Sequence, residues 1–378
     1  MKIPRFQQKN IEENLFKGKV IVLYGARRTG KTTLVKDILL KYPEKKSRYF
    51  DMEDPDLQNR FKNSGIEKLK LLLKNLDFIV FDEAQKLENI GQTLKLLVDH
   101  FPEKQVIATG SSSFELSNKV NEPLTGRKFV YHLFPISCAE LMLSGKDYFE
   151  ITPLFPEMLR FGMYPNVIDS TEEDSFEFLK ELTSSYLFRD IFTFQDVRNP
   201  EMLKKLLQLL AFQIGSEISY HEIAKRLRIT EETVQRYIHL LEEAFIIFRL
   251  PAFARNHRRE IVKSRKLFFW DLGIRNMLIK NTNTLDYRND IGALWENFVI
   301  AERMKFLEYT RQEKNSYFWR TYDQKEIDLI EESGGKLQAY EIKWNTLKKV
   351  KPPKLFLETY ENSEFKIINQ ENFLGFVS

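Results

Sequence analysis

Cysteine is almost missing from this sequence, which contains only Cys138 among 378 residues. A single cysteine cannot form a disulfide within the chain, which excludes a disulfide-held secreted scaffold and favours a reducing compartment. The sequence also has no apolar run of membrane-spanning length, and its start, MKIPRFQQKN, lacks the apolar segment of a signal peptide. We therefore expect a cytoplasmic protein that makes no use of a membrane.

A strong charge of one sign is missing as well. The net charge is +4, from 58 Lys and Arg against 54 Asp and Glu, so any affinity for nucleic acid must come from local patches. No low-complexity tract or short repeat is present. The content of 43% hydrophobic and 30% charged residues is that of a globular chain, and the length predicts two or three domains.

The segment LYGARRTGKTTLV, residues 23–35, contains two glycines spaced to surround a phosphate group. Gly25, Gly30, Lys31 and Thr32 fit the pattern G-x-x-x-x-G-K-[ST], in which backbone N–H groups cradle phosphates and the lysine reaches the outer ones. An apolar run, KVIVLYG, precedes the loop, and a helical pattern, KTTLVKDILLKY, follows it. This order predicts a phosphate site at a helix N-terminus. The weaker alternative is a glycine-rich turn with an incidental lysine.

Acidic residues follow a second apolar run, FIVF, at Asp82 and Glu83. An aspartate at the end of such a strand can hold Mg²⁺ together with the loop hydroxyl, here Thr32. Glu83 is then placed to polarise water for attack on the γ-phosphate. A further run, QVIATGSSS, leads to Thr109 and Ser111, one of which could hydrogen-bond the γ-phosphate. Plain solvated turns are the alternative at both places.

Strands and helices alternate in the N-terminal region, which predicts an α/β domain with a parallel sheet, helices on both faces and the nucleotide at the carboxyl ends of the strands. Arg127 comes just before the last strand, where its guanidinium could reach a phosphate of its own or a neighbouring chain as an arginine finger; a surface arginine is the alternative. After FPISCAEL, helical patterns predict a lid or connector. The predicted strands are Val20–Tyr24, Arg48–Met52, Phe78–Phe81, Gln105–Ala108 and Phe129–Leu133.

The segment SYHEIAKRLRITEETVQRYIHLLEEAFIIFRL predicts two helices joined by a tight turn, with Ser219 and Thr230 as N-caps. The second helix should bury Val234, Tyr237, Ile238 and Leu241 and expose its other face. A β-ribbon could follow, in which Arg255, His257, Arg258, Arg259, Lys263, Arg265 and Lys266 gather. This is the profile of a winged helix-turn-helix, and it predicts DNA contacts by Gln235, Arg236, His239, Arg255, Arg258 and Arg259. A protein-docking or architectural role is the alternative.

The C-terminal third reads as strands joined by an SGG turn, in SYFWRTYDQKEIDLIEESGGKLQAYEIKW. Because residues two apart share a face of a strand, Glu341 and Lys343 lie on one polar face, and Asp328 points away from its apolar neighbours. An aspartate on one strand and Glu-x-Lys on the next is an arrangement that metal-dependent nucleases use. Glu296, in a helical stretch, could add a carboxylate. The charged edge of an ordinary sheet is the alternative.

Taken together, these motifs resemble a family, the bacterial and archaeal AAA-type ATPases that carry a C-terminal domain of uncharacterised function with a restriction-endonuclease-like core. The resemblance rests on GARRTGKTTLV, FIVFDEAQ, ATGSSS, LTGRKFVYHLFPIS, RYIHLLEEAFII, KLFFWDLGIRNML, GALWENFVIAE and EIDLI…YEIKW. It implies Mg²⁺ at Thr32 and Asp82, hydrolysis aided by Glu83, and a winged helix between the ATPase and nuclease-like parts. It also implies ATP bound by the loop residues Gly25, Ala26, Arg27, Arg28, Thr29, Gly30, Lys31, Thr32 and Thr33.

The expected organisation is an ATPase domain at residues 1–145, a helical lid or connector at 146–200, a winged helix at 201–265 and a mixed-sheet, nuclease-like domain at 266–378. Two functions remain open. In one, ATP governs a DNA-bound module that cuts through Glu296, Asp328, Glu341 and Lys343. In the other, ATP occupancy switches the grip on DNA or a protein partner without cleavage. A small-molecule kinase is a third, weaker alternative, and a homo-oligomer is open in each case.

Overall fold

The computed structural model describes residues 2–111, 120, 123–186, 199–253, 265–321, 325–347, 350–352 and 354–378. The chain separates into two compact units. The N-terminal unit comprises Pro4–Phe134 with Glu243–Phe245, and the C-terminal unit comprises chiefly Pro135–Glu242 and Ile246–Ser378. The four-part division expected from the sequence stays a prediction.

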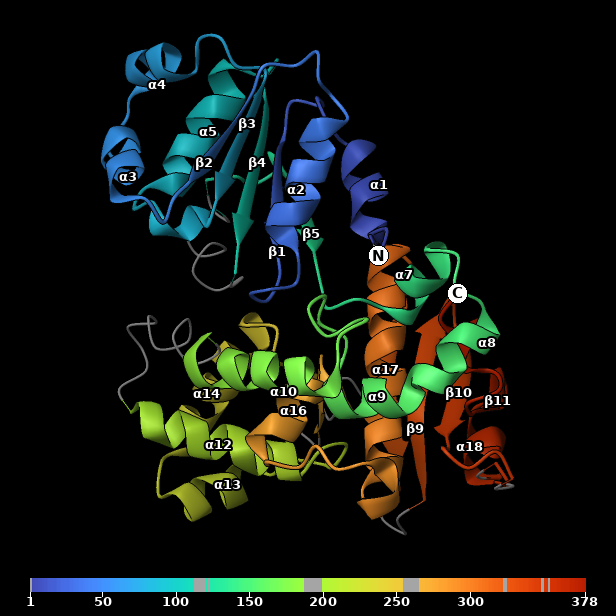
Figure 1. Ribbon diagram of the computed structural model, residues 1–378. Helices are drawn as coiled ribbons and strands as arrows, with labels where there is room; N and C mark the ends of the chain where they lie inside the picture. The colour runs from blue at the N-terminus through green and yellow to red at the C-terminus, as the bar shows by residue number, and fades with distance from the viewer. Residues whose placement is uncertain are drawn as a thin grey trace. The chain divides into compact units, whose positions relative to one another are not determined.

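The N-terminal unit is built on a parallel sheet of five strands in the order β2-β3-β4-β1-β5, which confirms the predicted parallel α/β fold (Figure 1). The fourth predicted strand continues to Gly110, so Thr109 lies within it. The strands are β1 (Val20–Tyr24), β2 (Ser47–Asp51), β3 (Phe78–Asp82), β4 (Gln105–Gly110) and β5 (Lys128–His132). The helices are α1 (Phe6–Glu12), α2 (Lys31–Leu40), α3 (Pro55–Phe61), α4 (Ile66–Leu73), η1 (Ala84–Lys86) and α5 (Ile90–His100).

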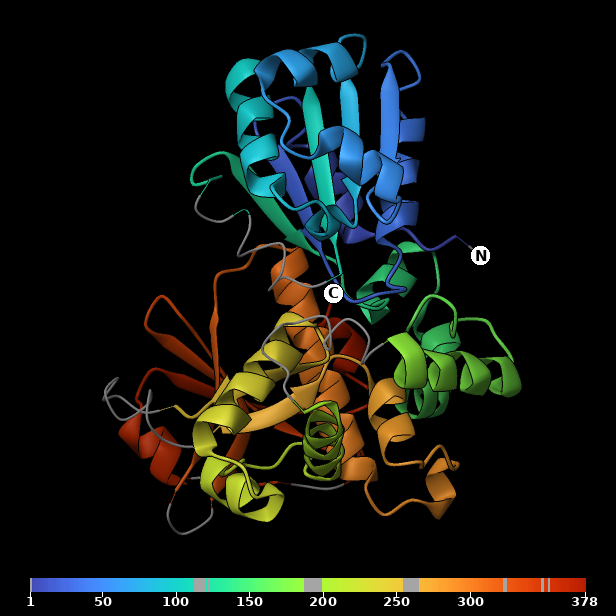
Figure 2. The same ribbon diagram turned by 90° about the vertical axis from the view of Figure 1, so that its left-hand side faces the viewer.

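Helices lie on both faces of this sheet (Figure 1, Figure 2). Successive side chains of the buried strands point alternately to the two faces. Phe78 and Val80 of β3 pack in one cluster with residues of α1 and α2. Phe81, one residue out of phase, contacts Phe50 of β2 and Phe61 of α3 on the opposite face. Because both faces are covered, the strands read as nearly continuous apolar runs.

The first part of the C-terminal unit is helical, as expected beyond FPISCAEL. Its elements up to the two-stranded ribbon are α7 (Cys138–Leu143), α8 (Tyr148–Ile151), η2 (Thr152–Leu154), α9 (Phe155–Phe161), α10 (Glu172–Glu181), η3 (Leu182–Tyr186), α12 (Pro200–Phe212), α13 (Tyr220–Leu227) and α14 (Glu231–Glu243). Among the described residues, no helix combines the length and the apolar composition that crossing a bilayer requires.

The predicted caps of the two helices that resemble a helix-turn-helix are present. Ser219 Oγ accepts a hydrogen bond from the Glu222 N–H at 3.3 Å, and Thr230 Oγ1 accepts one from the Thr233 N–H at 3.2 Å. After α14, the antiparallel strands β6 (Ile247–Pro251) and β7 (Arg265–Phe269) form a two-stranded sheet. Three helices and a ribbon therefore follow one another in this segment.

The second part of the C-terminal unit contains the predicted mixed sheet, of four strands in the order β11-β10-β9-β8. Strands β8, β9 and β10 are antiparallel neighbours, and β11 pairs in parallel with β10. The strands are β8 (Asn315–Arg320), β9 (Glu326–Ser333), β10 (Lys336–Ile342) and β11 (Ser363–Ile368). The helices are α16 (Leu272–Leu278), η4 (Leu285–Tyr287), α17 (Ile291–Tyr309), α18 (Lys354–Thr359) and α19 (Phe373–Phe376).

The SGG turn forms the hairpin between β9 and β10, where Gly334 and Gly335 have φ of 57° and 76°. Residues with side chains rarely adopt such values, so the two glycines set the register of the hairpin. That register pairs Leu329 with Tyr340, and the next residues along are Asp328 and Glu341. Since residues directly opposite share a face, these two acids lie on the same side of the sheet.

The motif KLFFWDLGIRNML has a structural role in the C-terminal unit. Asp271 is buried, caps α16 by accepting from the Ile274 N–H at 3.2 Å, and accepts from the Met163 N–H at 2.7 Å. The Asn276 side chain donates to the carbonyls of Leu159 and Arg160, both at 2.8 Å. These contacts fasten α9 to α16, which explains the motif without a catalytic role.

A buried ion-pair network joins α17 to the mixed sheet. The carboxylate of Glu331 on β9, of which 1% of the side chain is exposed, receives two hydrogen bonds from Arg303 of α17, at 2.6 and 2.9 Å. Lys314 donates to the same carboxylate at 2.7 Å. Arg303 and Lys314 together lower the pKa of Glu331, although burial alone would raise it.

We expect E331Q to lower the free energy of unfolding of the C-terminal unit by about 3 kcal/mol, because two cations would keep only neutral partners in a buried site. Urea unfolding followed by tryptophan fluorescence measures this, since all four tryptophans lie between residues 270 and 344. The matched control is E364Q on β11, an exposed pair with Lys366, which should leave the midpoint unchanged. Equal effects of both variants would contradict the importance of the network.

Candidate functional site

The glycine-rich loop connects β1 to α2 at the carboxyl end of the parallel sheet. Gly25 has no room for a side chain, because a Cβ there would lie 2.2 Å from the Leu133 carbonyl oxygen. Gly30 precedes α2 with φ of 96°, a left-handed conformation that favours glycine. The ammonium of Lys31 donates to the carbonyls of Gly25 and Ala26, at 2.7 and 3.0 Å. The lysine is thus folded back into the loop that it would serve.

The other loop residues predicted to hold the nucleotide are also placed by the backbone. Thr29 is fully buried, and its hydroxyl donates to the Ala26 carbonyl at 2.8 Å. Arg28, with φ of 64°, and Thr33 are exposed, whereas Arg27 is half-buried and lies 3.6 Å from the carboxylate of Glu53. Only part of the predicted set therefore faces the interior of the loop.

The predicted magnesium ligands lie side by side. The Thr32 hydroxyl, in the first turn of α2, donates to Asp82 Oδ2 at 2.8 Å, although the two residues are 50 positions apart. The hydroxyls of Tyr49 and Thr109 also donate to the Asp82 carboxylate, one to each oxygen. A hydroxyl and a carboxylate oxygen are the hard ligands that Mg²⁺ accepts, with phosphate oxygens and water completing its shell. These residues fit a nucleotide-bound Mg²⁺.

Glu83 follows Asp82 in a left-handed conformation, with φ of 47°. Its carboxylate accepts a hydrogen bond from the side-chain amide of Gln85, which also donates to Ser111 Oγ at 3.2 Å. Gln85 was not predicted from the sequence, although it belongs to the quoted segment FIVFDEAQ. It joins the acid that would activate water to the hydroxyl that could sense the γ-phosphate.

Arg5 is a second loop contact that the sequence reasoning missed. Its guanidinium donates to the carbonyls of Thr29 at 2.7 Å and Phe134 at 2.6 Å. It therefore ties the glycine-rich loop to the chain that leaves β5. A lone arginine 20 residues before the loop gives no local pattern that could have predicted this contact.

The prediction for Arg127 needs a correction in one respect. Its carbonyl accepts from the Val20 N–H at the amino end of β1, whereas the glycine-rich loop follows Tyr24 at the other end. Five residues of strand span about 16 Å at the usual rise, so the side chain is directed to the wrong edge for its own nucleotide. Arg127 instead pairs with Asp99 at 2.6 Å. A contact with a neighbouring chain stays a prediction.

The four predicted nuclease-like residues come together in the C-terminal unit. Lys343 lies 2.6 Å from Glu341 Oε1 and 3.6 Å from Asp328 Oδ2. Asp328 Oδ2 also accepts from the Ile342 N–H at 2.7 Å. Oxygens of Glu296, Asp328 and a residue that was not predicted, Glu326, all lie within 4.8 Å of one another. The cluster is formed by α17, β9 and β10, and the period-two pattern of EIDLI could have indicated Glu326.

Lys266 corrects the expectation that it belongs to an exposed basic ribbon. It lies on β7 with 3% of its side chain exposed, and its ammonium contacts Glu296 at 2.8 Å and also Glu326. Burial and the charge of Asp328 raise the pKa of Glu296 to about 8, against the influence of Lys266. Because an ammonium already contacts two of the three acids that would bind a metal, the arrangement does not fit a bound divalent ion.

The residues predicted to contact DNA are described only in part. Gln235 and His239 are exposed on α14, opposite the four predicted apolar residues, all of which are buried. Arg236 is half-buried and packs over the Tyr237 ring at 5.7 Å, so it does not lie on the exposed face as expected. Arg255, Arg258 and Arg259 lie outside the described residues.

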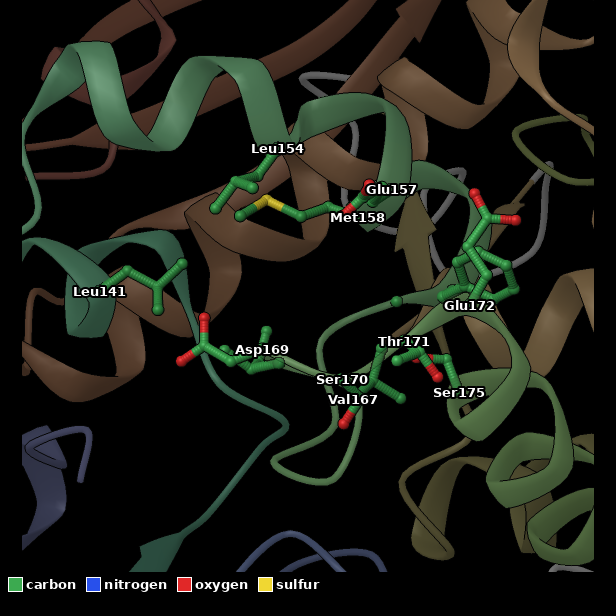
Figure 3. Close-up of a pocket in the computed structure, with 13 residues that line it drawn as sticks. Leu141, Leu154, Glu157, Met158, Val167, Asp169, Ser170, Thr171, Glu172 and Ser175 are labelled. Atoms are coloured by element: carbon green, nitrogen blue, oxygen red, sulfur yellow. The ribbon is translucent and has the colours of Figure 1, made fainter. Parts of the chain in front are cut away.

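A separate pocket of about 250 Å³ lies in the C-terminal unit between α7, α9 and α10 (Figure 3). Leu141, Leu154 and Met158 give it an apolar wall, and Asp169 and Glu172 give it acidic edges. No predicted site residue lines it.

The fold and the loop geometry define a P-loop nucleotide-binding domain in the N-terminal unit. Family models agree: residues 17–142 match the AAA domain, residues 152–285 a domain of unknown function, DUF8612, and residues 291–372 another, DUF4143. The chain thus carries an AAA-type P-loop ATPase domain, followed by domains whose families have no assigned function. The predicted ATPase resemblance is confirmed at this level.

Curated relatives align with most of this chain at low identity. An uncharacterized protein of Mycobacterium tuberculosis is 28% identical over 335 residues, which cover 87% of this chain and 71% of that protein. An uncharacterized protein of Methanocaldococcus jannaschii is 28% identical over 312 residues, 78% of this chain and 68% of that protein. Among solved structures, AMPPCP-bound DnaA from Aquifex aeolicus matches with a TM-score of 0.28 and 19% identity, over 63% of this chain and 86% of DnaA; this score supports no conclusion.

The raised pKa of Glu296 predicts a pH dependence of stability. A carboxyl group whose pKa rises from 4.5 to about 8 on folding holds its proton more tightly in the folded state, so the folded state loses stability as pH rises through that window. The free energy of unfolding of the wild type, relative to E296Q, should therefore fall between these two pH values. Tryptophan-monitored urea titrations at several pH values measure the difference, and a pH-independent difference would contradict the assignment.

Proposed function

We propose that this protein binds ATP with Mg²⁺ and hydrolyses it, and that its nucleotide state controls how the C-terminal unit contacts DNA. The observation that carries the proposal is the hydrogen bond between Thr32 and Asp82, beside the loop lysine. The Thr32 hydroxyl, the Asp82 carboxylate and the Lys31 ammonium thus lie near one another, as binding of a triphosphate with Mg²⁺ requires. The buried, single cysteine is consistent with a cytoplasmic location, which is part of the proposal.

The residues of the loop have distinct tasks in nucleotide binding. The backbone N–H groups at the start of α2 bind phosphate oxygens, assisted by the positive end of the helix dipole. Lys31 exchanges its two carbonyl partners for the outer phosphates, and Thr32 and Asp82 hold Mg²⁺, which supplies charge neutralisation when it is bound.

Hydrolysis requires a base near the outer phosphate, and Glu83 is our candidate. Its carboxylate is held by Gln85, which also contacts Ser111. The Ser111 hydroxyl can donate to a γ-phosphate while its oxygen still accepts from Gln85, so Gln85 would couple the phosphate to the carboxylate that orients water. Arg127 is our candidate for completing the site from a neighbouring chain in a homo-oligomer.

The segment from α12 to β7 is proposed to be a winged helix that contacts DNA. The helix order, the two caps and the antiparallel ribbon support this. Gln235 and His239 on the exposed face of α14 would reach the groove, and Arg255, Arg258 and Arg259 would contact phosphates. A protein partner bound at the same face is the alternative.

Between the two functions left open by the sequence, we favour the switch without cleavage. The carboxylates that a cutting metal would need are already in contact with Lys266 and Lys343. We propose that the nuclease-like fold binds DNA or a protein partner without cutting it. Metal-dependent cleavage through Asp328, Glu341 and Lys343 is the second candidate.

We expect K31A to lose tight ATP binding and E83Q to retain binding but lose turnover, by about a hundredfold or more. Calorimetry with ATP and Mg²⁺ measures the first effect, and phosphate release measures the second. The control K68A changes an exposed lysine on α4 and should change neither. Unchanged ATP affinity in K31A would contradict the loop assignment, and wild-type turnover in E83Q would remove Glu83 from its role.

We expect DNA affinity to differ between the ATP-bound and nucleotide-free protein, which E83Q allows to be measured at equilibrium. In R258E/R259E, the slope of log affinity against log salt should become shallower by about 1.8, or about 0.9 for each lost phosphate contact. The control K68E/K70E makes the same charge change on α4, where both lysines are exposed, and should keep the wild-type slope.

Gel analysis of the same mixtures with supercoiled DNA and Mg²⁺ or Mn²⁺ separates the two candidate functions. Intact DNA under all conditions supports the switch. Cutting that disappears in D328A would establish the cleaving enzyme instead.

A further inference from the structure

We propose that Lys266 is the resident cation of the acidic cluster of Glu296, Glu326 and Asp328, and that the cluster binds a divalent metal ion only if this lysine is displaced. The proposal is independent of the nucleotide site, because it concerns residues of the C-terminal unit alone. It explains why a nuclease-like arrangement of carboxylates would fail to hold a cutting metal.

The position of the ammonium is the first argument. Lys266 Nζ lies 2.8 Å from Glu296 Oε1 and contacts Glu326 Oε1. The ligand oxygens of Glu296, Glu326 and Asp328 lie within 4.8 Å of one another. A divalent ion bound by these oxygens would need to lie about 2.0–2.6 Å from each. The ammonium therefore lies beside the space that a metal ion bound by Glu296 and Glu326 would take, and two cationic centres so close together repel each other.

The charges around the cluster are the second argument. Lys343 contacts the other two carboxylates, those of Glu341 at 2.6 Å and Asp328 at 3.6 Å. Arg320 lies 3.7 Å from Glu326 and pairs with Glu217 at 2.6 Å. Each of the four acids is therefore already within reach of a positive charge. A metal ion would gain attraction from these acids only by weakening existing ion pairs.

The third argument is that neighbouring elements hold β7, and with it Lys266, in place. Asn297, next to Glu296 on α17, accepts from the Phe269 N–H at 2.7 Å and donates to the Phe269 carbonyl at 2.8 Å, which fixes β7 against α17. On its other side, Lys266 forms a backbone bridge with Glu217, and its ammonium lies 5.6 Å from the Phe318 ring. Burial leaves the ammonium no alternative partner in water.

The cluster thus links the ribbon to the mixed sheet. Lys266 comes from β7, and its partners come from α17 and β9. The chain just after β6 also contacts β8, through the hydrogen bond from the Phe253 N–H to the Phe318 carbonyl at 2.6 Å. Displacing the ammonium would break the ion pairs that join β7 to α17 and β9. Metal binding should therefore weaken the link between the ribbon and the mixed sheet.

The test is Mn²⁺ binding to the nucleotide-free full chain, measured by calorimetry in an Asp82→Asn background that removes the other candidate metal ligand. We expect K266M, which keeps the length but not the charge, to bind one Mn²⁺ at least about tenfold more tightly than the parent, because a competing charge at contact distance is lost. The additional substitution D328N should abolish the gain.

The control is R320M, which removes a positive charge near Glu326 but leaves the Lys266 ammonium in place. If that ammonium is the cause, R320M should bind Mn²⁺ much as the parent does. An equal gain in R320M and K266M would show a general charge effect and overturn the proposal. Tight, Asp328-dependent Mn²⁺ binding by the parent would overturn it as well.

Thermal unfolding gives a second readout in case K266M is unstable. The loss of the ammonium leaves buried acids without their partner, so K266M should melt below the parent, and Mn²⁺ should raise its midpoint while leaving the midpoint of the parent unchanged. The shorter neutral variant K266Q should behave alike. Variants that Mn²⁺ neither binds nor stabilises would contradict the proposal.

Discussion

The hydrogen bond from Thr32 to Asp82 depends on the parallel alignment of strands that the rest of the N-terminal unit maintains. Thr32 lies in the first turn of α2, which follows β1, and Asp82 is the last residue of β3. The two meet because β1 and β3 end at the same edge of the sheet, with β4 between them. The buried apolar runs of the strands hold this edge in place, because helices cover both faces of the sheet. A local sequence motif becomes a site through a long-range packing constraint.

The sequence predicted the loop well because its chemistry is mostly backbone chemistry. Gly25 and Gly30 have conformational reasons to be glycine, and their spacing to Lys31 is fixed along the chain. By contrast, Arg5, Tyr49 and Gln85 act through contacts across the fold, and no periodic pattern distinguishes them from surface residues. The expectation that Arg127 could reach the nucleotide of its own chain failed for a related reason. A residue before a strand and a residue after it lie at opposite edges of a parallel sheet.

The C-terminal unit shows the limits of reading charge from sequence. Asp328, Glu341 and Lys343 were brought together correctly by the period of two along their strands. Lys266 sits among arginines and lysines in the sequence, so composition suggested a solvated patch, yet its strand turns it into the protein interior. Whether a lysine is solvated or paired with an acid depends on the element packed against it. For Lys266 this element is α17, which carries Glu296 and lies beside the mixed sheet (Figure 1).

Arg5 has a consequence for where the nucleotide-binding part of the chain begins. The AAA family model starts at residue 17, yet one planar guanidinium, 12 positions earlier, spans the carbonyls of Thr29 and Phe134. A lysine could not present two donors in that fixed fork. The stretch before the first helix therefore supports the glycine-rich loop, and a domain boundary drawn by family likeness alone would remove this support.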